Sequence, residues 1–444
     1  MTVPYGIEVP DRIPKERYYD AGFAALEAEQ LWSRTWQMAC RLEEIPDPRD
    51  FVEYRILDQS VIVVRQDDGS VAAFQNACRH RGVELVQGRG RCGKAFVCPF
   101  HGWRYDVDGS NVAVTQKRSF AEHNLDPAEL GLVPVRCETL AGFAFVNFDL
   151  AAPSLRESLE PTASALDAWK FESLRAEWWY AARLPVNWKL AIEAFVEMYH
   201  VVQAHPQLVI PTRFGMREGA EFDPVAFVDA DIQYLRAMSE GMAGMCPATD
   251  VAVAESLRGI DLPTEAKEAM AVWNRTLNDA VVDWHRARGH DVPDLNDLGE
   301  RGLNLTFFHG FPNFVVLPMY SGASSYRFRP LGPEETLMEI WSLERVPEGT
   351  ERPAPPAPEW WSVDDPRWPP IPAQDFSNLP KQQRGLHARG FEYMRLSAGL
   401  EGHIANCHRV LDGFLAGLPH DRLLPAVQEV NQYPFERPIV DLGL

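Results

Sequence analysis

The pattern of hydrophobic and polar positions changes character twice along the chain. Residues 15–45 are rich in helix formers, with apolar side chains at three- and four-residue spacing, which predicts short helices. From Phe51 to about residue 148, short β-branched and aromatic runs alternate with turn residues, which predicts a compact all-β module. After Asp149 helical and strand-like segments mix, which predicts a second, larger α+β domain.

The second half of the chain contains helical stretches around one proline-rich segment. A long helical stretch is predicted to begin near Trp188, and two more are predicted at about 377–416 and 421–430. Residues 353–372 contain eight prolines, too many for regular structure, so we expect an extended surface loop or a flexible connection there.

Composition excludes several classes of protein. Of the 444 residues 46% are hydrophobic, which excludes a wholly disordered chain. The net charge of −20 disfavours binding to nucleic acid or to anionic lipid, and the sequence has no run of about 18 apolar residues that would cross a membrane. Seven cysteines, an odd number spread thinly, do not resemble a disulfide framework. We therefore expect a cytoplasmic protein.

Two cysteines and two histidines form the first candidate metal site. They occur as C-x-H and C-x₂-H on two predicted hairpin loops: Cys78, His80, Cys98 and His101. Zinc accepts such a set, and the spacing alone does not exclude it. The order favours a [2Fe–2S] cluster, because two thiolates can hold one iron while two imidazoles hold the other. Gly82 and Gly102 follow the ligands where we expect the loop backbone to approach the sulfides closely, and Trp103 can shield the cluster from water.

A second candidate site lies in residues 187–207. Glu193, Glu197 and His200 are spaced i, i+4 and i+7, so they share one face of a helix. His205 lies five residues after His200, and an uninterrupted helix could not aim both rings at one ion. Pro206 disfavours helical geometry at His205, so we expect the helix to loosen between the histidines. Two histidines and one carboxylate from elsewhere would suit non-haem Fe(II).

Both segments resemble known families. The stretch CRHRG…CPFHGW resembles the Rieske iron–sulfur proteins, and Val83 and Phe100 stand where the respiratory type has extra cysteines, which implies the lower-potential oxygenase type. The NWK…E…E-x-Y-H-x₄-H segment resembles the catalytic alpha subunits of Rieske aromatic ring-hydroxylating oxygenases. This resemblance implies that Asp375, in a short acidic motif before a helix, is the third iron ligand. It also implies that Glu197 bridges the iron site to His101 of a neighbouring subunit.

The resemblance also implies a fold and a function. The expected fold is α+β: N-terminal helices (1–45), an all-β Rieske domain (46–152) and a helix-grip catalytic domain with an antiparallel sheet (153–444). The expected function is the terminal oxygenase of a ring-hydroxylating system that uses O₂, a [2Fe–2S] cluster and one Fe(II) per chain on a small apolar, often aromatic, substrate. Electrons would come from NAD(P)H through a separate reductase or ferredoxin, and the expected assembly is a homotrimer, with or without a small beta subunit. The alternative is an electron carrier or iron–sulfur scaffold whose second site is vestigial.

The remaining candidate residues concern docking and the substrate. Arg89, Arg91 and Lys94 lie in a Gly-rich segment expected to be an exposed loop beside the cluster, where they could dock an acidic electron donor. Ala194 stands where many family members have Asn near the iron, and His309 either lines the substrate cavity or is a core histidine. For the other histidines we expect solvated positions (His285 and His290) and surface or packing positions (His403 and His408).

Overall fold

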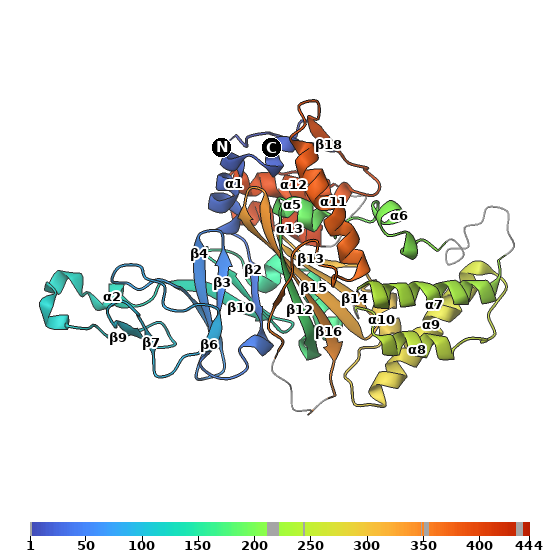
Figure 1. The fold of residues 1–444 in the computed structure, drawn as a ribbon, viewed down its shortest axis with the longest axis horizontal. Coiled ribbons are helices and arrows are strands. Elements are labelled where there is room, and N and C mark those ends of the chain that lie inside the picture. The colour runs from blue at the N-terminus through green and yellow to red at the C-terminus, as the bar shows by residue number, and fades with distance from the viewer. Residues whose placement is uncertain (1, 211–221, 243–244, 348, 350–354, 432–437) are drawn as a thin grey trace.

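The computed structural model describes residues 2–210, 222–242, 245–347, 349, 355–431 and 438–444. Its N-terminal half contains a seven-stranded antiparallel sheet in the order β2-β11-β10-β5-β4-β3-β6. These strands are β2 (Gln37–Arg41), β3 (Asp50–Ile56), β4 (Gln59–Arg65), β5 (Val71–Gln75), β6 (Arg89–Arg91), β10 (Pro134–Leu140) and β11 (Phe143–Asn147). A small second sheet is formed by β7 (Phe96–Val97), β8 (Arg104–Tyr105) and β9 (Asn111–Ala113). The short helix α2 (Pro127–Leu130) lies near this second sheet, at the left end of the molecule in Figure 1.

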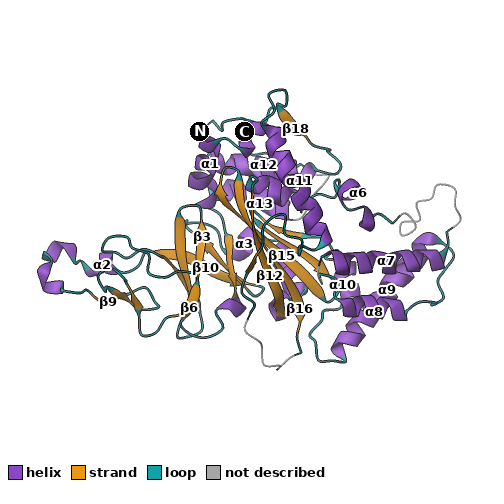
Figure 2. Cartoon of the chain, viewed as in Figure 1, coloured by secondary structure: helices purple, strands orange, loops and turns teal. Residues whose placement is uncertain are grey.

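A six-stranded sheet forms the centre of the C-terminal half, in the order β13-β14-β15-β16-β12-β17. Its strands are β12 (Leu174–Leu184), β13 (Phe308–Gly310), β14 (Phe314–Met319), β15 (Gly322–Gly332), β16 (Glu335–Arg345) and β17 (Glu359–Trp360). All pairs are antiparallel except β12 with β17. Figure 2 shows this sheet between two groups of helices.

The helices fall into two groups around the larger sheet (Figure 1). One group, near the two chain ends, contains α1 (Ala21–Glu27), α5 (Trp188–Glu193), α11 (Pro370–Leu386), α12 (Gly402–Leu415) and α13 (His420–Asn431). The other group contains α7 (Pro224–Gly241), α8 (Ala248–Ser256), α9 (Ala266–Arg286) and α10 (Leu295–Glu300). The short α6 (Val201–Ala204) lies between the groups, α3 (Leu155–Leu159) and α4 (Thr162–Ala168) precede β12, and β1 (Arg12–Pro14) pairs with β18 (Tyr393–Arg395).

Three local predictions differ from the structure. Residues 37–41, expected to be helical, form β2, an edge strand of the first sheet that pairs with β11. All five of its side chains are buried, on both faces of the strand, and this burial outweighs the local helix propensity. The first sheet therefore begins before residue 46. The helix that begins at Trp188 ends at Glu193, and the stretch 377–416 is divided by β18.

Two buried arginines join the two sheets. Arg327 and Arg329 of β15 both form ion pairs with Glu339 of β16, with N–O distances of 2.7 and 2.9 Å. Arg327 also donates to the backbone carbonyls of Met38 and Ala39 in β2, and Arg329 donates to that of Arg55 in β3. One carboxylate on the larger sheet thus orients two cations that bind the backbone of the smaller domain.

In the part of the chain that the structure describes, no helix has both the length and the apolar character needed to span a membrane.

Candidate metal centres and active site

The four residues of the first motif lie on two loops of matching geometry. Cys78 follows β5, and Cys98 follows β7. In each loop the backbone carbonyl of the cysteine accepts a hydrogen bond from the glycine four residues later, over 2.8 Å from Gly82 and 3.0 Å from Gly102. The His80 and His101 rings lie 4.7 Å apart between centroids, edge to face. The loops therefore bring the two imidazoles together beside the two buried thiols.

The glycines of these loops have a backbone conformation that favours glycine. Both have φ of +73°, the left-handed region that disfavours side chains. A Cβ at Gly102 would also lie 3.2 Å from Thr115 Oγ1. Trp103 is buried and stacks on His80 with centroids 5.1 Å apart, which shields one face of that ring from water.

The surroundings of these loops fit an iron–sulfur cluster. Burial disfavours ionisation of Cys98, but the backbone N–H groups of His101 and Phe100 more than offset it and lower the pKa of the thiol. The Tyr105 hydroxyl lies 3.2 Å from Cys78 Sγ. His80 Nδ1 is buried and has no hydrogen-bond partner among the described residues, as expected for a ligand atom whose partner is the metal. Donors to both sulfurs and an unpaired imidazole nitrogen are the features such a cluster needs.

Three further side chains converge at the second motif. His200 immediately precedes α6, His205 immediately follows it, and Asp375 projects from α11. Asp375 Oδ1 lies 3.1 Å from His205 Nε2 and 3.7 Å from His200 Nε2. His205 has φ −122° and ψ 61°, outside the helical region, so the helical turn α6 between the two histidines ends at Ala204, which confirms the break that we expect before Pro206. Asp375 lies inside α11, not before the helix as we expected, because the helix already begins at Pro370.

The outward-facing nitrogen of each histidine has a hydrogen-bond acceptor. Glu197 Oε1 lies 2.5 Å from His200 Nδ1, and Gln374 Oε1 lies 2.6 Å from His205 Nδ1. A proton held at Nδ1 leaves the lone pair at Nε2, which faces Asp375. The three groups therefore fit one metal ion with acceptors behind both imidazoles, and further coordination positions remain open. Sequence analysis did not foresee the role of Gln374, although it adjoins Asp375.

The two glutamates of the motif do not share a face. Glu193 is the last residue of α5 and points away from the metal-binding group, where it accepts from Tyr18 over 2.9 Å and lies 3.0 Å from His408 Nε2. Burial raises the pKa of Glu193 to about 7. Since the helix ends between the two carboxylates, each has its own imidazole neighbour and their repulsion is avoided.

A cavity of about 380 Å³ opens beside His200, His205 and Asp375. Its walls are largely apolar and aromatic, with a few amides, and include Ala194, Phe195, Met238, Asn274, Leu317 and Tyr326. Ala194 thus lines the cavity, as we expect. His200 and Asp375 also border a second cavity of about 600 Å³, whose walls combine polar side chains such as Gln203 and Gln374 with apolar ones such as Leu379 and Met394.

His309 does not line this cavity. It is fully buried on β13 and contacts His403 of α12, because the strand directs its side chain toward that helix. His403 and His408 are also buried, as expected for packing positions. His285 is buried in a pair with Asp250, so the expectation that it is solvated is wrong.

Of the three proposed docking residues, Arg89 and Arg91 lie on a strand, and Lys94 lies in the loop that follows it, where we expect it. Arg89 and Arg91 belong to the edge strand β6, which pairs with β3, and all three cations are exposed. Arg91 forms an exposed ion pair with Asp47 over 3.1 Å, and Arg89 contacts the backbone carbonyl of Pro356. The positive charge is therefore present at the surface, partly offset at Arg91.

Sequence comparison identifies both parts of the chain. Residues 35–128 match the Rieske [2Fe–2S] domain, and residues 171–417 match the catalytic domain of the ring-hydroxylating alpha subunit. The chain is 32% identical over 365 residues to the biphenyl dioxygenase alpha subunit of Paraburkholderia xenovorans (strain LB400), covering 74% of this chain and 70% of that protein.

Two further similar proteins are named for compounds other than biphenyl. The carnitine monooxygenase oxygenase subunit of Escherichia coli (strain K12) is 33% identical over 196 residues, which is 44% of this chain and about half (52%) of that relative. A solved structure of a quaternary ammonium Rieske monooxygenase, described with carnitine oxidation and inter-subunit electron transfer, aligns with a TM-score of 0.60 at 20% identity, over 91% of this chain and 96% of that one. The fold is thus shared by proteins named for quite different compounds. The chain belongs to the ring-hydroxylating alpha-subunit family, with a Rieske [2Fe–2S] domain preceding its catalytic domain.

Proposed function

We propose that this chain is the terminal oxygenase component of a Rieske oxygenase system. Cys78, His80, Cys98 and His101 would hold the [2Fe–2S] cluster, and His200, His205 and Asp375 would hold the mononuclear Fe(II). Bound there, the cluster supplies single electrons and the Fe(II) activates O₂ beside a substrate. The observation that carries the proposal is the convergence of His200 Nε2, His205 Nε2 and Asp375 Oδ1 at the wall of a mainly apolar cavity of about 380 Å³. An electron carrier with a vestigial second site would need neither.

The walls of the cavity support a neutral, apolar substrate. Among the described residues, its only acidic side chains are Glu197 and Asp375 at the metal group, and its walls include no arginine or lysine. A carboxylate such as that of carnitine would enter without a cationic partner, which is costly in an apolar cavity. Asn274, Asn278 and Asn304 can bind a polar substituent on an otherwise apolar ring. An aromatic or similarly apolar ring compound is therefore the proposed substrate class.

Product analysis tests the function and the substrate class together. Purified protein, reduced chemically, is given O₂ and either a neutral aromatic hydrocarbon such as biphenyl or L-carnitine, and products are identified by mass spectrometry with ¹⁸O₂. Oxygen from ¹⁸O₂ in a hydroxylated ring compound supports the proposal. Turnover of carnitine alone would overturn the substrate class. Failure to incorporate ¹⁸O₂ into any compound of a panel of aromatic acids, polycyclic hydrocarbons and steroids would favour the electron-carrier alternative.

We propose that electrons pass between subunits of a homotrimer. The strand β7, beside the loop with Cys98 and His101, lies at one end of the molecule, while α6 and α11, beside the iron-binding group, lie on the other side of the larger sheet (Figure 1). Glu197 borders both the substrate cavity and the second cavity, where the Rieske loops of a neighbour would fit. In this arrangement Glu197 links the neighbour's His101 to His200. Native mass measurement distinguishes a homotrimer from an assembly with a small beta subunit.

The electron donor is proposed to be a separate ferredoxin or NAD(P)H-dependent reductase that docks on the cations of β6 and Lys94. The six arginines and lysines of residues 79–104 are all exposed and contrast with the overall charge of −20, which supports steering of an acidic partner. All seven cysteines are free thiols, which supports a location in the reducing cytoplasm.

A further inference from the structure

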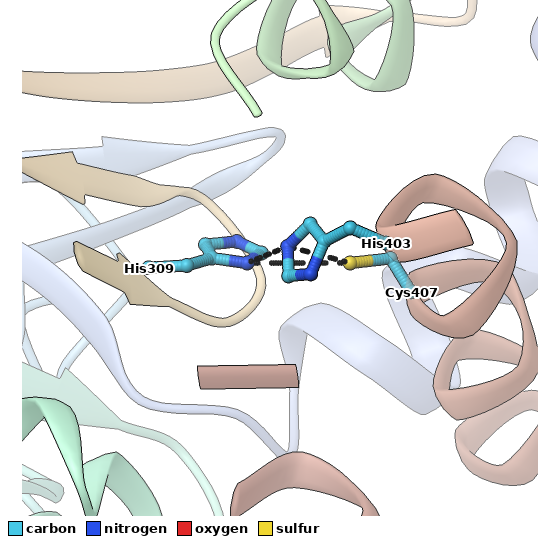
Figure 3. A group of neighbouring side chains, drawn as sticks. All are labelled: His309, His403 and Cys407. Atoms are coloured by element: carbon cyan, nitrogen blue, oxygen red, sulfur yellow. Dashed lines mark hydrogen bonds between the residues drawn. The ribbon is translucent and has the colours of Figure 1, made fainter. Parts of the chain in front are cut away.

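A second group of metal-binding side chains lies away from both centres described above. His309 projects from β13, and His403 and Cys407 project from α12, one helical turn apart (Figure 3). All three side chains point toward a common centre, and none of them belongs to the Rieske loops or to the His200, His205 and Asp375 group. The group therefore has a strand on one side and a helix on the other, with space for an ion between them.

The spacing of the three atoms agrees with tetrahedral coordination. His309 Nδ1 lies 3.0 Å from His403 Nε2, and Cys407 Sγ lies 3.6 Å from His403 Nε2 and 4.0 Å from His309 Nδ1. Zn–N bonds of about 2.0 Å and a Zn–S bond of about 2.3 Å at tetrahedral angles place two nitrogens about 3.3 Å apart and nitrogen and sulfur about 3.5 Å apart. Each side of the observed triangle lies within about 0.5 Å of these values.

Hydrogen bonding alone explains the triangle less well. His403 Nε2 carries either one proton or one lone pair, and it faces both His309 Nδ1 and Cys407 Sγ. One of the two contacts therefore lacks a full hydrogen bond in the absence of a metal. A cation at the centre would use all three lone pairs at once.

The surroundings favour a soft or borderline divalent ion. His309 and His403 are both buried, and each imidazole has a ring nitrogen that can offer a lone pair to an ion. A coordinating thiol loses its proton to solvent when the metal binds, which leaves a site of two neutral imidazoles and one thiolate. A small cavity of about 30 Å³ adjoins His309 and Cys407, with space for one water as a fourth ligand, and the carboxyl group of Glu193 also lines it.

We propose that His309, His403 and Cys407 form a third metal site of this chain, which binds Zn²⁺ and ties β13 to α12. Two imidazoles and one thiolate are zinc ligands, whereas iron in the catalytic group is held by imidazole and carboxylate. The site has a structural role, because it fixes the edge strand β13 of the larger sheet against helix α12.

X-ray absorption at the zinc edge tests the site without interference from iron. The holoprotein is dialysed against a mild chelator, its zinc content is measured by mass spectrometry, and the zinc-edge spectrum is recorded for wild type, Cys407→Ser and the control Cys137→Ser. Cys137 is a partly buried thiol on β10, outside every metal-binding group among the described residues. The proposal predicts about one zinc per chain with a single sulfur neighbour at about 2.3 Å and nitrogen at about 2.0 Å. Cys407→Ser should lose that sulfur and most of its zinc, and Cys137→Ser should keep both.

Four results would overturn the proposal, and each is distinct. Wild-type protein without tightly held zinc has no such site. Zinc with only nitrogen and oxygen neighbours would be an occupant of the His200, His205 and Asp375 group, and zinc with two sulfurs would be an occupant of the Rieske loops. Sulfur-ligated zinc that persists in Cys407→Ser lies elsewhere. The wild-type spectrum alone shows whether a one-sulfur site exists, so the test holds even if Cys407→Ser fails to fold.

Discussion

Both carboxylate oxygens of Glu197 are held beside His200. Oε1 lies 2.5 Å from His200 Nδ1, and Oε2 accepts from the backbone N–H groups of Tyr199 and His200. This fixes Glu197 between the substrate cavity and the second cavity, in contact with a proposed iron ligand without being one. The same carboxylate orients the histidine and faces the place where a neighbouring subunit would dock.

Replacing Glu197 by Ala should break communication between the centres in protein reconstituted with excess Fe(II), which is needed because the change also removes the acceptor behind His200 and so weakens iron binding. The bridging group is lost, but the iron ligands remain. Rapid mixing of the reduced protein with O₂ and substrate should show reoxidation of the cluster slowed by at least about 100-fold, since small misplacements of reacting groups have effects of this size. Trimer assembly and iron content are the controls, and normal reoxidation would exclude the bridging role.

Replacing Gln374 by Leu should weaken iron binding at the second site. Gln374 Oε1 is the acceptor that fixes the His205 ring, and loss of such a partner weakens metal affinity by about 10- to 100-fold. Titration of iron-free protein with Fe(II) measures the affinity. Gln382→Leu, on the same helix with its amide directed at Met394, is the matched control and should leave the affinity unchanged. Equal affinities for the two variants would show that Gln374 does not support the ligand.

Glu339→Gln should loosen the two domains. The change leaves Arg327 and Arg329 buried without a countercharge, and breaking such a group costs about 3–5 kcal/mol. Denaturant unfolding should report this loss, whereas Glu335→Gln, on the same strand with a more exposed partner, should change stability by less than about 1 kcal/mol.

Protonation of Glu339 should lower the stability of the folded protein at acid pH. Burial alone raises the pKa of Glu339, but the two guanidinium groups more than offset it and lower the folded-state pKa below the ordinary value of 4.5. The ion pairs therefore contribute fully above that value, and their contribution is lost as the pH falls through the folded-state pKa. Unfolding followed from pH 7 to pH 3 should show a steeper loss of stability for wild type than for Glu339→Gln. Parallel curves for the two proteins would contradict this assignment.

Reversing the charges of Arg89, Arg91 and Lys94 to Glu should weaken docking of the electron donor. The donor concentration for half-maximal rate should rise, and its dependence on salt should flatten, because complementary charge acts mainly on association. Turnover driven by a small chemical reductant should stay unchanged.

Reversal of three exposed cations on α9 and its C-terminal end, Lys267, Arg275 and Arg288, changes the net charge equally at a distant surface. That control should behave like wild type with the natural donor. Equal behaviour of the two triple variants across a salt series would place the docking surface elsewhere.

The sequence predicted the parts of the fold and the site that depend on local spacing. The loops with Cys78 and Cys98 and the break at His205 follow from residues close together in the chain. The acceptor role of Gln374 and the strand at Gln37–Arg41 did not follow, because they depend on partners far away in sequence. For the same reason the sequence did not indicate the group of His309, His403 and Cys407. His309 lies 94 residues before His403 and 98 before Cys407, and it meets them only when β13 packs beside α12.

Iron content tests the central claim most directly. Wild-type protein should contain about three irons per chain, two in the cluster and one at the second site. Asp375→Ala should contain about two, with the visible spectrum of a Rieske cluster unchanged and all oxygenation lost. A variant that keeps the third iron and turns over substrate would contradict the assignment of His200, His205 and Asp375 as the oxygen-activating centre.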